Sequence, residues 1–428
     1  MKFGGTSLAD AGQFRKVKAI FESRSGSRFV VASAPGKRFS GDEKVTDLLY
    51  RYADTGDEEV LEAIRLRFEA LLQELSLSLS LEADFDCLRQ AQQQPGSRDF
   101  LVSRGEYLNS KVLAAWLGLP FLDAADAIFF RADGRLDEER TYAALGAQLK
   151  AAGEAVLPGF YGSLPDGTVR TFSRGGSDVT GAIAARAVQA DLYENWTDVP
   201  GLLMADPTIV PHPAVIPEIT YQELRVLAYM GAAVLHDEAI FPVREAHIPI
   251  NIRNTNAPEE SGTMIVSERT LASQQAITGI AGKTGFSAIT VEKDKMNADS
   301  GFGRKILEAL EACGVTPDHV PAGVDAMSVL VSTKALEGRK EELTQRILRA
   351  TGADRVTIED GIALLTVVGQ GMVQMAGTAG RLMTAIAREN IHIRLLEQCF
   401  EKTIMVIGIR TEEYAAAMQA VYQEFASN

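Results

Sequence analysis

The chain has 428 residues, of which 46% are hydrophobic and 23% charged, and at roughly 150 residues per domain this predicts a globular protein of about three domains. No apolar run reaches the roughly 18 residues of a membrane-spanning helix, the start Met-Lys-Phe-Gly-Gly predicts no secretory signal, and the three cysteines stand far apart. We therefore expect a cytoplasmic protein without a disulfide scaffold or thiolate zinc site, and the formal charge of −14 argues against nucleic acid or an anionic membrane as a partner.

The first 35 residues predict a glycine-rich loop, a helix and the short strand 28–33. The glycines Gly4 and Gly5, with Ser7, let the backbone approach an oxygen-rich ligand, and Lys2 adds a positive charge, so the segment suits a polyphosphate. It is not a Walker A loop, because Gly-Lys-Ser/Thr does not follow. The alternative is a solvated lysine before a hairpin.

Residues 43–75 predict helices, 92–97 a loop and 101–117 an amphipathic helix. The motif Ser-Arg-Gly-Glu at 103–106 is expected at the start of that last helix. Glu106 is then either an ordinary acidic residue at a helix N-terminus or a carboxylate that binds the ammonium group of a substrate.

Between residues 155 and 252, short apolar strands alternate with helices, which predicts a mostly parallel sheet with helices on both faces. The motif Phe-Ser-Arg-Gly-Gly-Ser-Asp at 172–178 leads into a helix. Arg174 can grip a carboxylate with two hydrogen bonds, and Ser177 adds a donor at the helix start. Asp178 is either an ordinary helix N-terminal residue or the group that holds Lys2 in position.

The motif Trp-Thr-Asp-Val-Pro-Gly at 196–201 ends a predicted strand and is followed by Asp206. Ligands of open α/β sheets bind outside the carboxyl ends of the strands, so Thr197 and Asp198 are candidates for a nucleotide site, although the motif alone is a generic turn. The histidines are scattered without metal-ligand spacing, and no Gly-x-Ser-x-Gly elbow supports an acyl-transfer triad.

A turn-rich stretch at 256–262 is the expected domain boundary, and an internal repeat follows it. A strand at 289–291, a helix at 304–312 and a strand at 327–331 recur as 365–367, 381–388 and 404–409. Arg304 and Arg381 lie 77 residues apart, as do Val329 and Val406. The matching offset favours a duplicated α+β module.

The motifs Lys-Phe-Gly-Gly-Thr-Ser, Ser-Arg-Gly-Gly-Ser-Asp and Thr-Asp-Val-Pro-Gly come in the order of the aspartokinases, which the chain resembles over nearly its whole length. The resemblance implies a three-layer α/β/α sandwich with a mostly parallel sheet at 1–265, followed by tandem regulatory ACT domains of ferredoxin-like βαββαβ topology. One would comprise 284–350, and the other 274–283 with 351–428.

The resemblance implies phosphorylation of the L-aspartate side chain by ATP with Mg²⁺, which opens lysine, threonine, methionine and diaminopimelate biosynthesis. Lys2 and Asp178 are the implied catalytic pair. The implied aspartate-binding residues are Ser33, Thr46, Glu106, Phe160, Arg174 and Ser177. The implied nucleotide-binding residues are Lys2, Gly4, Gly5, Ser7, Thr197, Asp198, Leu203 and Asp206.

The loop 295–302 resembles the place where lysine-sensitive aspartokinases bind their inhibitor. Feedback by lysine, with threonine as a second possibility, would then act on a homodimer or larger homo-oligomer built through the ACT domains. The implied effector-binding residues are Met296, Asp299, Gly301, Phe302 and Asp318. The alternative is an ordinary β-to-α loop.

Two family cations are replaced here, a lysine by Ala233 and an arginine by Thr208, and Arg244 or Arg253 are candidates to substitute for them. Two other interpretations stay open. One, which the two replacements motivate, is a catalytically silent amino-acid sensor, against which Lys2, Arg174 and Asp178 argue together. The other is a kinase for another amino acid such as glutamate.

Overall fold

The structure is a computed structural model that describes residues 1–24, 26, 28–173, 175–232, 237–269, 276–398 and 403–426. The chain divides into two compact units. The first comprises Met1–Leu202, Val215–Arg225 and the described part of Val234–Thr270, and the second comprises Leu203–Ala214 and the described parts of Val226–Ala233 and Leu271–Asn428. In the described part of the chain, no helix is both long and apolar enough to cross a membrane.

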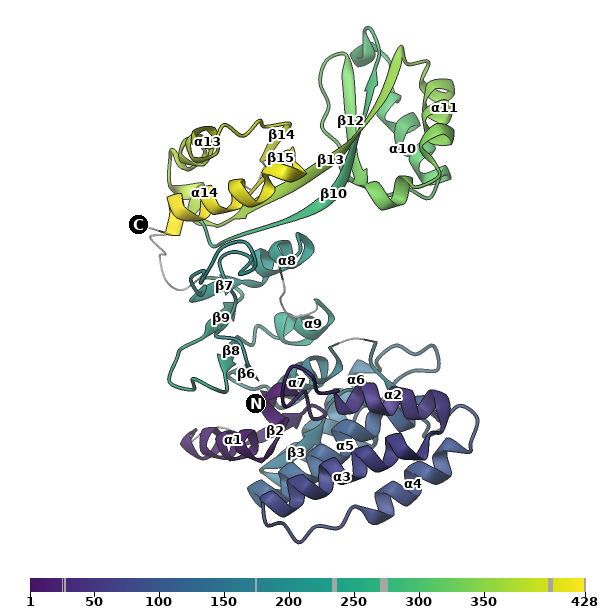
Figure 1. The fold of residues 1–428 in the computed structure, drawn as a ribbon, viewed down its shortest axis with the longest axis vertical. Helices are drawn as coiled ribbons and strands as arrows, with labels where there is room; N and C mark the ends of the chain where they lie inside the picture. The colour runs from purple at the N-terminus through teal and green to yellow at the C-terminus, as the bar shows by residue number, and fades with distance from the viewer. Residues whose placement is uncertain are drawn as a thin grey trace. The chain divides into compact units, whose positions relative to one another are not determined.

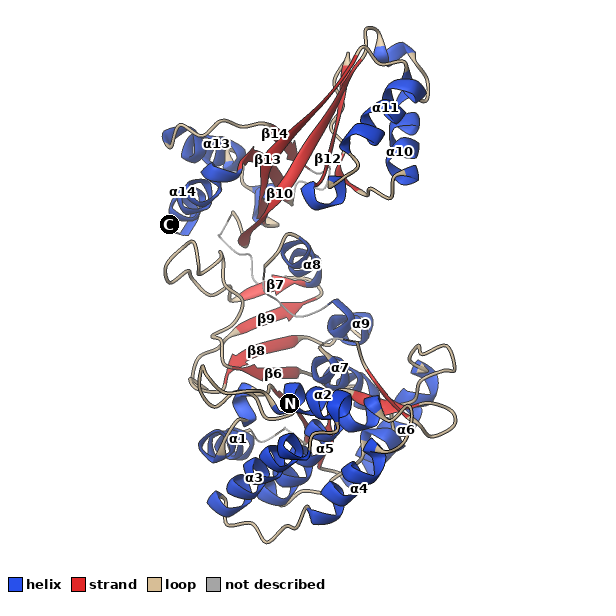
Figure 2. Cartoon of the chain, turned by 45° about the vertical axis from the view of Figure 1, so that its right-hand side comes forward, coloured by secondary structure: helices blue, strands red, loops and turns tan. Residues whose placement is uncertain are grey.

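The first unit is built on a seven-stranded sheet in the order β3-β2-β1-β6-β8-β9-β7 (Figure 2). These strands are β1 (Lys2–Phe3), β2 (Phe29–Ala32), β3 (Ala155–Pro158), β6 (Tyr193–Thr197), β7 (Glu218–Thr220), β8 (Ile250–Asn254) and β9 (Thr263–Val266). Every pairing is parallel except that of β8 with β9. A two-stranded antiparallel ribbon, β4 (Tyr161–Ser163) with β5 (Val169–Thr171), follows β3.

Helices cover both faces of this sheet because alternate strand residues point to opposite sides. Val30 and Ala32 pack in one apolar core with α1 (Ala11–Ser23), α2 (Val45–Thr55), α3 (Glu58–Glu74), α4 (Glu82–Gln92) and α5 (Arg98–Leu117). Val31 packs in a second core with α6 (Glu138–Ala152), α7 (Gly176–Val188) and α9 (Asp237–Glu245). Helix α8 (Tyr221–Tyr229) runs from the first unit into the second, and 3₁₀ turns occupy Thr6–Leu8 and Ala124–Asp126.

The second unit contains a six-stranded sheet in the order β11-β12-β10-β13-β15-β14, paired antiparallel throughout. Its strands are β10 (Gly279–Glu292), β11 (Pro317–His319), β12 (Ala326–Ser332), β13 (Arg355–Val368), β14 (Leu395–Gln398) and β15 (Ile404–Arg410). Its helices are α10 (Phe302–Ala312), α11 (Lys340–Thr351), α12 (Gly371–Gln374), α13 (Thr378–Arg388) and α14 (Tyr414–Ala426), with 3₁₀ turns at Met296–Ala298, Thr333–Leu336 and Thr411–Glu413. Figure 1 shows α10 and α11 beside one end of the long strands β10 and β13, and α13 and α14 beside the other.

The sequence repeat reappears in the strand register of this sheet. Ile289 of β10 pairs with Val329 of β12, and Thr366 of β13 pairs with Val406 of β15. Both partners are displaced by the same 77 residues, from 289 to 366 and from 329 to 406. The fold class is therefore the expected one, a mostly parallel α/β sheet followed by an antiparallel ACT-type region. The exact domain boundaries stay a prediction.

Candidate functional site

The predicted site residues of the first unit gather where four neighbouring parallel strands end. Gly4 follows β1, Ser33 follows β2, Phe160 follows β3, and Thr197 ends β6. Since parallel strands place their carboxyl ends along one edge, residues that are distant in sequence meet there. The sheet therefore offers a composite site at this edge.

The glycines of the first motif allow two loops to touch through their backbones. We call residues 4–7, which the sequence predicts to contact phosphates, the phosphate loop. The amide of Gly36 donates to the carbonyl of Gly5 at 2.7 Å, and a Cβ on Gly36 would lie 2.5 Å from the carbonyl carbon of Gly5. The amide of Gly4 donates to the carbonyl of Trp196 at 2.9 Å, and the Oγ of Ser7 lies 2.8 Å from Oγ1 of Thr255. Neighbouring backbone thus fixes this loop on two sides.

Lys2 is buried in the sheet, with 6% of its surface exposed. Its Nζ lies 2.7 Å from Oδ1 of Asp178 in the first turn of α7 and 3.4 Å from Oδ1 of Asn195 on β6. Nδ2 of Asn195 donates to the same Asp178 oxygen at 2.7 Å. The alternative of a solvated lysine before a hairpin is therefore wrong, because Lys2 belongs to a central strand of the sheet.

The start of α7 packs against the loop that follows β3. Gly175 begins the helix in the left-handed conformation, at φ 59°. A Cβ on Gly159 would lie 2.6 Å from the Cβ of Ser177, and Phe160 has a φ of 81° while its amide donates to Oγ1 of Thr180 at 3.1 Å. The structure thus places Phe160 and Ser177 side by side. Arg174, predicted between them in sequence, lies outside the described residues.

Glu106 lies in the interior of α5 and not at its start. The helix begins at Arg98, which places Glu106 in its third turn. The apolar spacing predicts this helix only from residue 101 and so misses its first three residues, 98–100. The helix-terminus interpretation of this carboxyl is therefore wrong.

The surroundings of Glu106 favour its neutral form. Its side chain is buried, with 5% of the residue exposed, and Oε2 has no hydrogen-bond partner among the described residues. Burial raises the pKa of Glu106 from 4.5 to about 8, opposed by a hydrogen bond from the backbone of Ala34 and by the charge of Arg104. An unsatisfied buried carboxyl beside the strand ends is a group suited to meet a cation.

The other predicted substrate residues lie around these. Ser33 donates its amide to the carbonyl of Phe3 at 3.2 Å, and its own carbonyl accepts from Nδ2 of Asn109 at 2.7 Å. Thr46 is half-buried in the first turn of α2.

The predicted nucleotide residues divide between the two units. Thr197, whose Oγ1 donates to Oδ1 of Asp198 at 3.2 Å, stays with the phosphate loop in the first unit. Leu203 and Asp206 belong to the second unit. There, Oδ1 of Asp206 accepts from the amide of Thr208 at 2.8 Å and from its hydroxyl at 2.7 Å.

Arg253 and Arg244, the candidates to replace the missing family cations, have different surroundings. The guanidinium of Arg253 donates to the carbonyls of Pro258 and Glu260 and lies 5.0 Å from the ring centre of Trp196, so it stabilises that loop. Arg244 lies 5.5 Å from the ring centre of Phe241. Ala233 lies outside the described residues.

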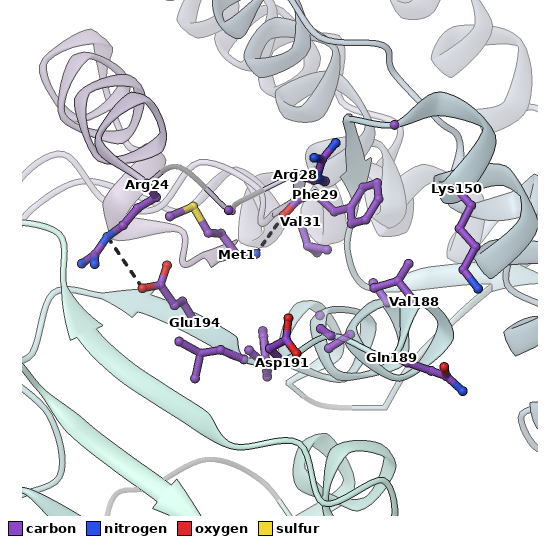
Figure 3. Close-up of a pocket in the computed structure, with 18 of the residues that line it drawn as sticks. Met1, Arg24, Arg28, Phe29, Val31, Lys150, Val188, Gln189, Asp191 and Glu194 are labelled. Atoms are coloured by element: carbon purple, nitrogen blue, oxygen red, sulfur yellow. Dashed lines mark hydrogen bonds and ion pairs between the residues drawn. The ribbon is translucent and has the colours of Figure 1, made fainter.

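A cavity of about 760 Å³ in the first unit lies at the opposite edge of the sheet (Figure 3). Its lining includes Met1, Phe29 and Tyr193, which stand at the amino ends of the strands. The predicted catalytic residues are not part of this lining.

The predicted effector residues lie in the second unit. Met296, Asp299, Gly301 and Phe302 form the connection between β10 and α10, where Asp299 pairs with the ammonium groups of Lys293 at 2.7 Å and Lys305 at 3.1 Å. These two hydrogen bonds lower the pKa of Asp299. Asp318 lies on β11 and accepts a hydrogen bond from the hydroxyl of Tyr229 at 3.0 Å.

Sequence reasoning missed Asn195, which contacts both members of the predicted catalytic pair. The available signal was the polar pair Glu194 and Asn195 inside the short predicted strand 192–196, since a buried polar side chain needs a partner.

Comparisons with known proteins identify the family of the chain. Residues 1–254 match the model of the amino acid kinase family, and residues 365–425 match an ACT domain. Aspartokinase 3 of Bacillus subtilis is 37% identical over 99% of this chain and 98% of its own. The crystal structure of Clostridium acetobutylicum aspartate kinase superposes with a TM-score of 0.92 at 43% identity, covering 99% of both chains.

A more distant relative has been solved with ligands. Escherichia coli aspartokinase III was solved in complex with aspartate and ADP, at a TM-score of 0.73 and 24% identity over 99% of both chains. It was also solved with lysine and aspartate, at a TM-score of 0.72 and the same identity over 99% of this chain and 98% of that one. At this identity the likeness is one of fold.

Proposed function

The chain belongs to the amino acid kinase family and is an aspartokinase, and from this premise we propose how its residues transfer the γ-phosphoryl group of ATP to the side-chain carboxylate of L-aspartate. The observation that carries the proposal is the buried contact between Lys2 and Asp178 at the carboxyl edge of the sheet. Lys2 contacts the transferred phosphoryl group, and Asp178 holds its ammonium in position. The phosphate loop, with Gly4, Gly5 and Ser7, surrounds the phosphates.

Aspartate lies between α5 and the start of α7. Glu106 binds its ammonium group, since Oε2 lacks any partner among the described residues. Arg174 and Ser177 bind carboxylate, and Phe160 closes the side of the pocket. Ser33 and Thr46 complete the substrate side, and Thr197 and Asp198 serve the nucleotide in the first unit. Leu203 and Asp206, in the second unit, stay predicted nucleotide residues.

The chemistry needs no general base. The carboxylate of aspartate is already ionised at neutral pH, so phosphoryl transfer depends on alignment and on positive charge near the γ-phosphate. This explains why the site can work without a catalytic histidine or cysteine.

Magnesium fits this site as an ion carried by ATP. The described residues contain no group of three or more His, Cys, Asp or Glu side chains that could hold a metal, and Mg²⁺ on a nucleotide typically takes only one or two protein carboxylates. Asp178 offers one, because its Oδ2 has no partner in the described part of the chain. When bound, Mg²⁺ would neutralise charge on the phosphates.

Regulation by lysine is a second proposal, on the same chain but another unit. The E. coli relative solved with lysine supports it, together with the ACT match. Met296, Asp299, Gly301, Phe302 and Asp318 would contact the effector, with a homo-oligomer formed through the ACT region.

The catalytic assignment is tested by trapping the acyl phosphate with hydroxylamine, with L-aspartate or L-glutamate as substrate. We expect hydroxamate from aspartate, and Lys2→Ala should lower turnover by orders of magnitude while the circular dichroism spectrum is retained. Lys16→Ala is the control, because this lysine is exposed and its Nζ binds Oδ1 of Asn256 at 2.7 Å. Near-normal turnover of Lys2→Ala would contradict the role of Lys2.

A further inference from the structure

Asn195 stands next to Lys2 in the sheet and is almost fully buried. The two residues are register partners on the parallel strands β1 and β6, so their side chains leave the same face of the sheet. Only 2% of the surface of Asn195 is exposed. An amide at such a place is costly to bury unless its oxygen and nitrogen both find partners.

Both partners of the amide are charged, and together they determine its orientation. An ammonium can only donate and a carboxylate can only accept, so Oδ1 must face Lys2, at 3.4 Å, and Nδ2 must face Asp178, at 2.7 Å. Leucine has nearly the same shape but neither polar atom. Aspartate has the acceptor for Lys2 but places a second carboxylate beside Asp178.

The contacts with Asp178 and Asn195 orient the ammonium group of Lys2. Of its three N–H groups, one faces Asp178, one faces Asn195, and the third has no partner among the described residues. A lysine side chain has about 2 kcal/mol of rotamer entropy, so an ammonium fixed by two neighbours is already oriented before the nucleotide arrives. Both contacts of Asp178 fall on Oδ1, so Lys2 and Asn195 together hold the position of that oxygen.

We propose that Asn195 is a positioning residue for phosphoryl transfer, which holds Lys2 and Asp178 so that the free N–H of Lys2 points to the transferred group. This inference rests on the proposed role of Lys2. Asn195 is buried and both ends of its amide face Lys2 and Asp178, so we expect its contribution to fall on the chemical step and not on binding.

The test is Asn195→Leu, assayed with saturating and limiting ATP and aspartate. We expect kcat to fall about 10- to 100-fold, the factor that a hydrogen bond to a charged group corresponds to, while both KM values stay within about twofold. A kcat within twofold of the unchanged enzyme would overturn the proposal. So would KM values that rise in step with the loss of kcat.

Asn251→Leu is the matched control, since Asn251 is also buried in the central sheet but pairs with Glu194 on β6 and therefore lies on the opposite face from Asn195. Equal losses of kcat in both variants would show a structural effect and overturn the proposal. Should Asn195→Leu fail to fold, Asn195→Asp is the deciding variant. We expect its kcat to fall at least tenfold, and an unchanged kcat would overturn the proposal. Lys2→Ala tests the proposed role of Lys2 separately. Normal turnover in this variant would contradict the proposed function itself, whatever the result for Asn195.

Discussion

Glu106→Gln is the most informative substitution in the substrate site, because it keeps the size of the side chain and removes only its charge. The pKa of about 8, against an ordinary 4.5, corresponds to roughly 5 kcal/mol at 1.36 kcal/mol per unit of pH, and this is the net free energy by which the surroundings, chiefly burial, disfavour the carboxylate. At pH 7 about one molecule in ten then carries the carboxylate that an ammonium group needs.

The consequence is a pH-dependent affinity for aspartate. The apparent dissociation constant equals the intrinsic one divided by the fraction of molecules in which Glu106 is charged. KM for aspartate should therefore fall about eightfold between pH 7 and pH 8.5. In Glu106→Gln this dependence should vanish, and KM should lie about 30-fold or more above the wild-type value at pH 8.5, since removing one partner of a buried charge pair costs at least about 2 kcal/mol. Initial rates at fixed saturating ATP measure both effects. A wild-type KM that does not change over this range would refute the reasoning.

The same group predicts how stability without ligand changes with pH. Its pKa in the folded chain is raised above the unfolded value, so its contribution to stability is complete below about pH 4.5 and is lost as pH rises through about 8. The melting temperature of the ligand-free enzyme should decline more steeply between pH 6 and pH 8.5 than that of Glu106→Gln. An equal decline of the melting temperature with pH in the two proteins would contradict the raised pKa of Glu106.

Three further predictions follow from contacts elsewhere. Gly36→Ala should raise KM for ATP or lower kcat at least tenfold, because its Cβ would meet backbone of the phosphate loop at 2.5 Å. The control is Gly41→Ala, whose nearest neighbour is a side chain at 3.7 Å, and its KM and kcat should stay within twofold of the wild-type values. Gly159→Ala should weaken aspartate binding at least tenfold, since its Cβ would lie 2.6 Å from the start of α7, and Gly167→Ala, whose glycine has a positive φ but open space around it, should lower only the melting temperature. Millimolar lysine should inhibit the enzyme, and Asp318→Asn should raise the half-inhibiting concentration at least tenfold; no response to lysine, alone or with threonine, would contradict the regulatory proposal.

The sequence predicted the architecture well because periodicity and order carry that information. The alternation of strands and helices indicated the parallel sheet, and the 77-residue offset reappears in the strand pairs that Ile289 and Thr366 make. The start of α5 was less predictable. Its first turn is polar at Arg98 and Asp99, so apolar spacing detects the helix only from Leu101, and Glu106 was placed too near the helix end.

Contacts between distant strands could not be predicted in the same way. Lys2 and Asn195 are 193 residues apart, and only the strand order β1-β6 makes them neighbours. The amide's role depends on that register, which no local pattern contains. Similarly, Leu203 and Asp206 follow the Thr-Asp motif closely in sequence but fall into the other unit, because the chain crosses between units at residue 203.

Two charged groups of the proposed site, Lys2 and Glu106, are compensated or neutral before ligands arrive. The ammonium of Lys2 is paired with Asp178, and at neutral pH the raised pKa of Glu106 keeps most of that carboxyl uncharged. A carboxyl with a pKa of about 8 could suggest a general base, but the nucleophilic carboxylate of aspartate has no proton to lose at neutral pH. In the proposed site, the carboxyl of Glu106 would therefore serve binding only, giving its proton to solvent when the ammonium of aspartate enters, so its substitution should change KM, whereas substitutions around Lys2 should change kcat.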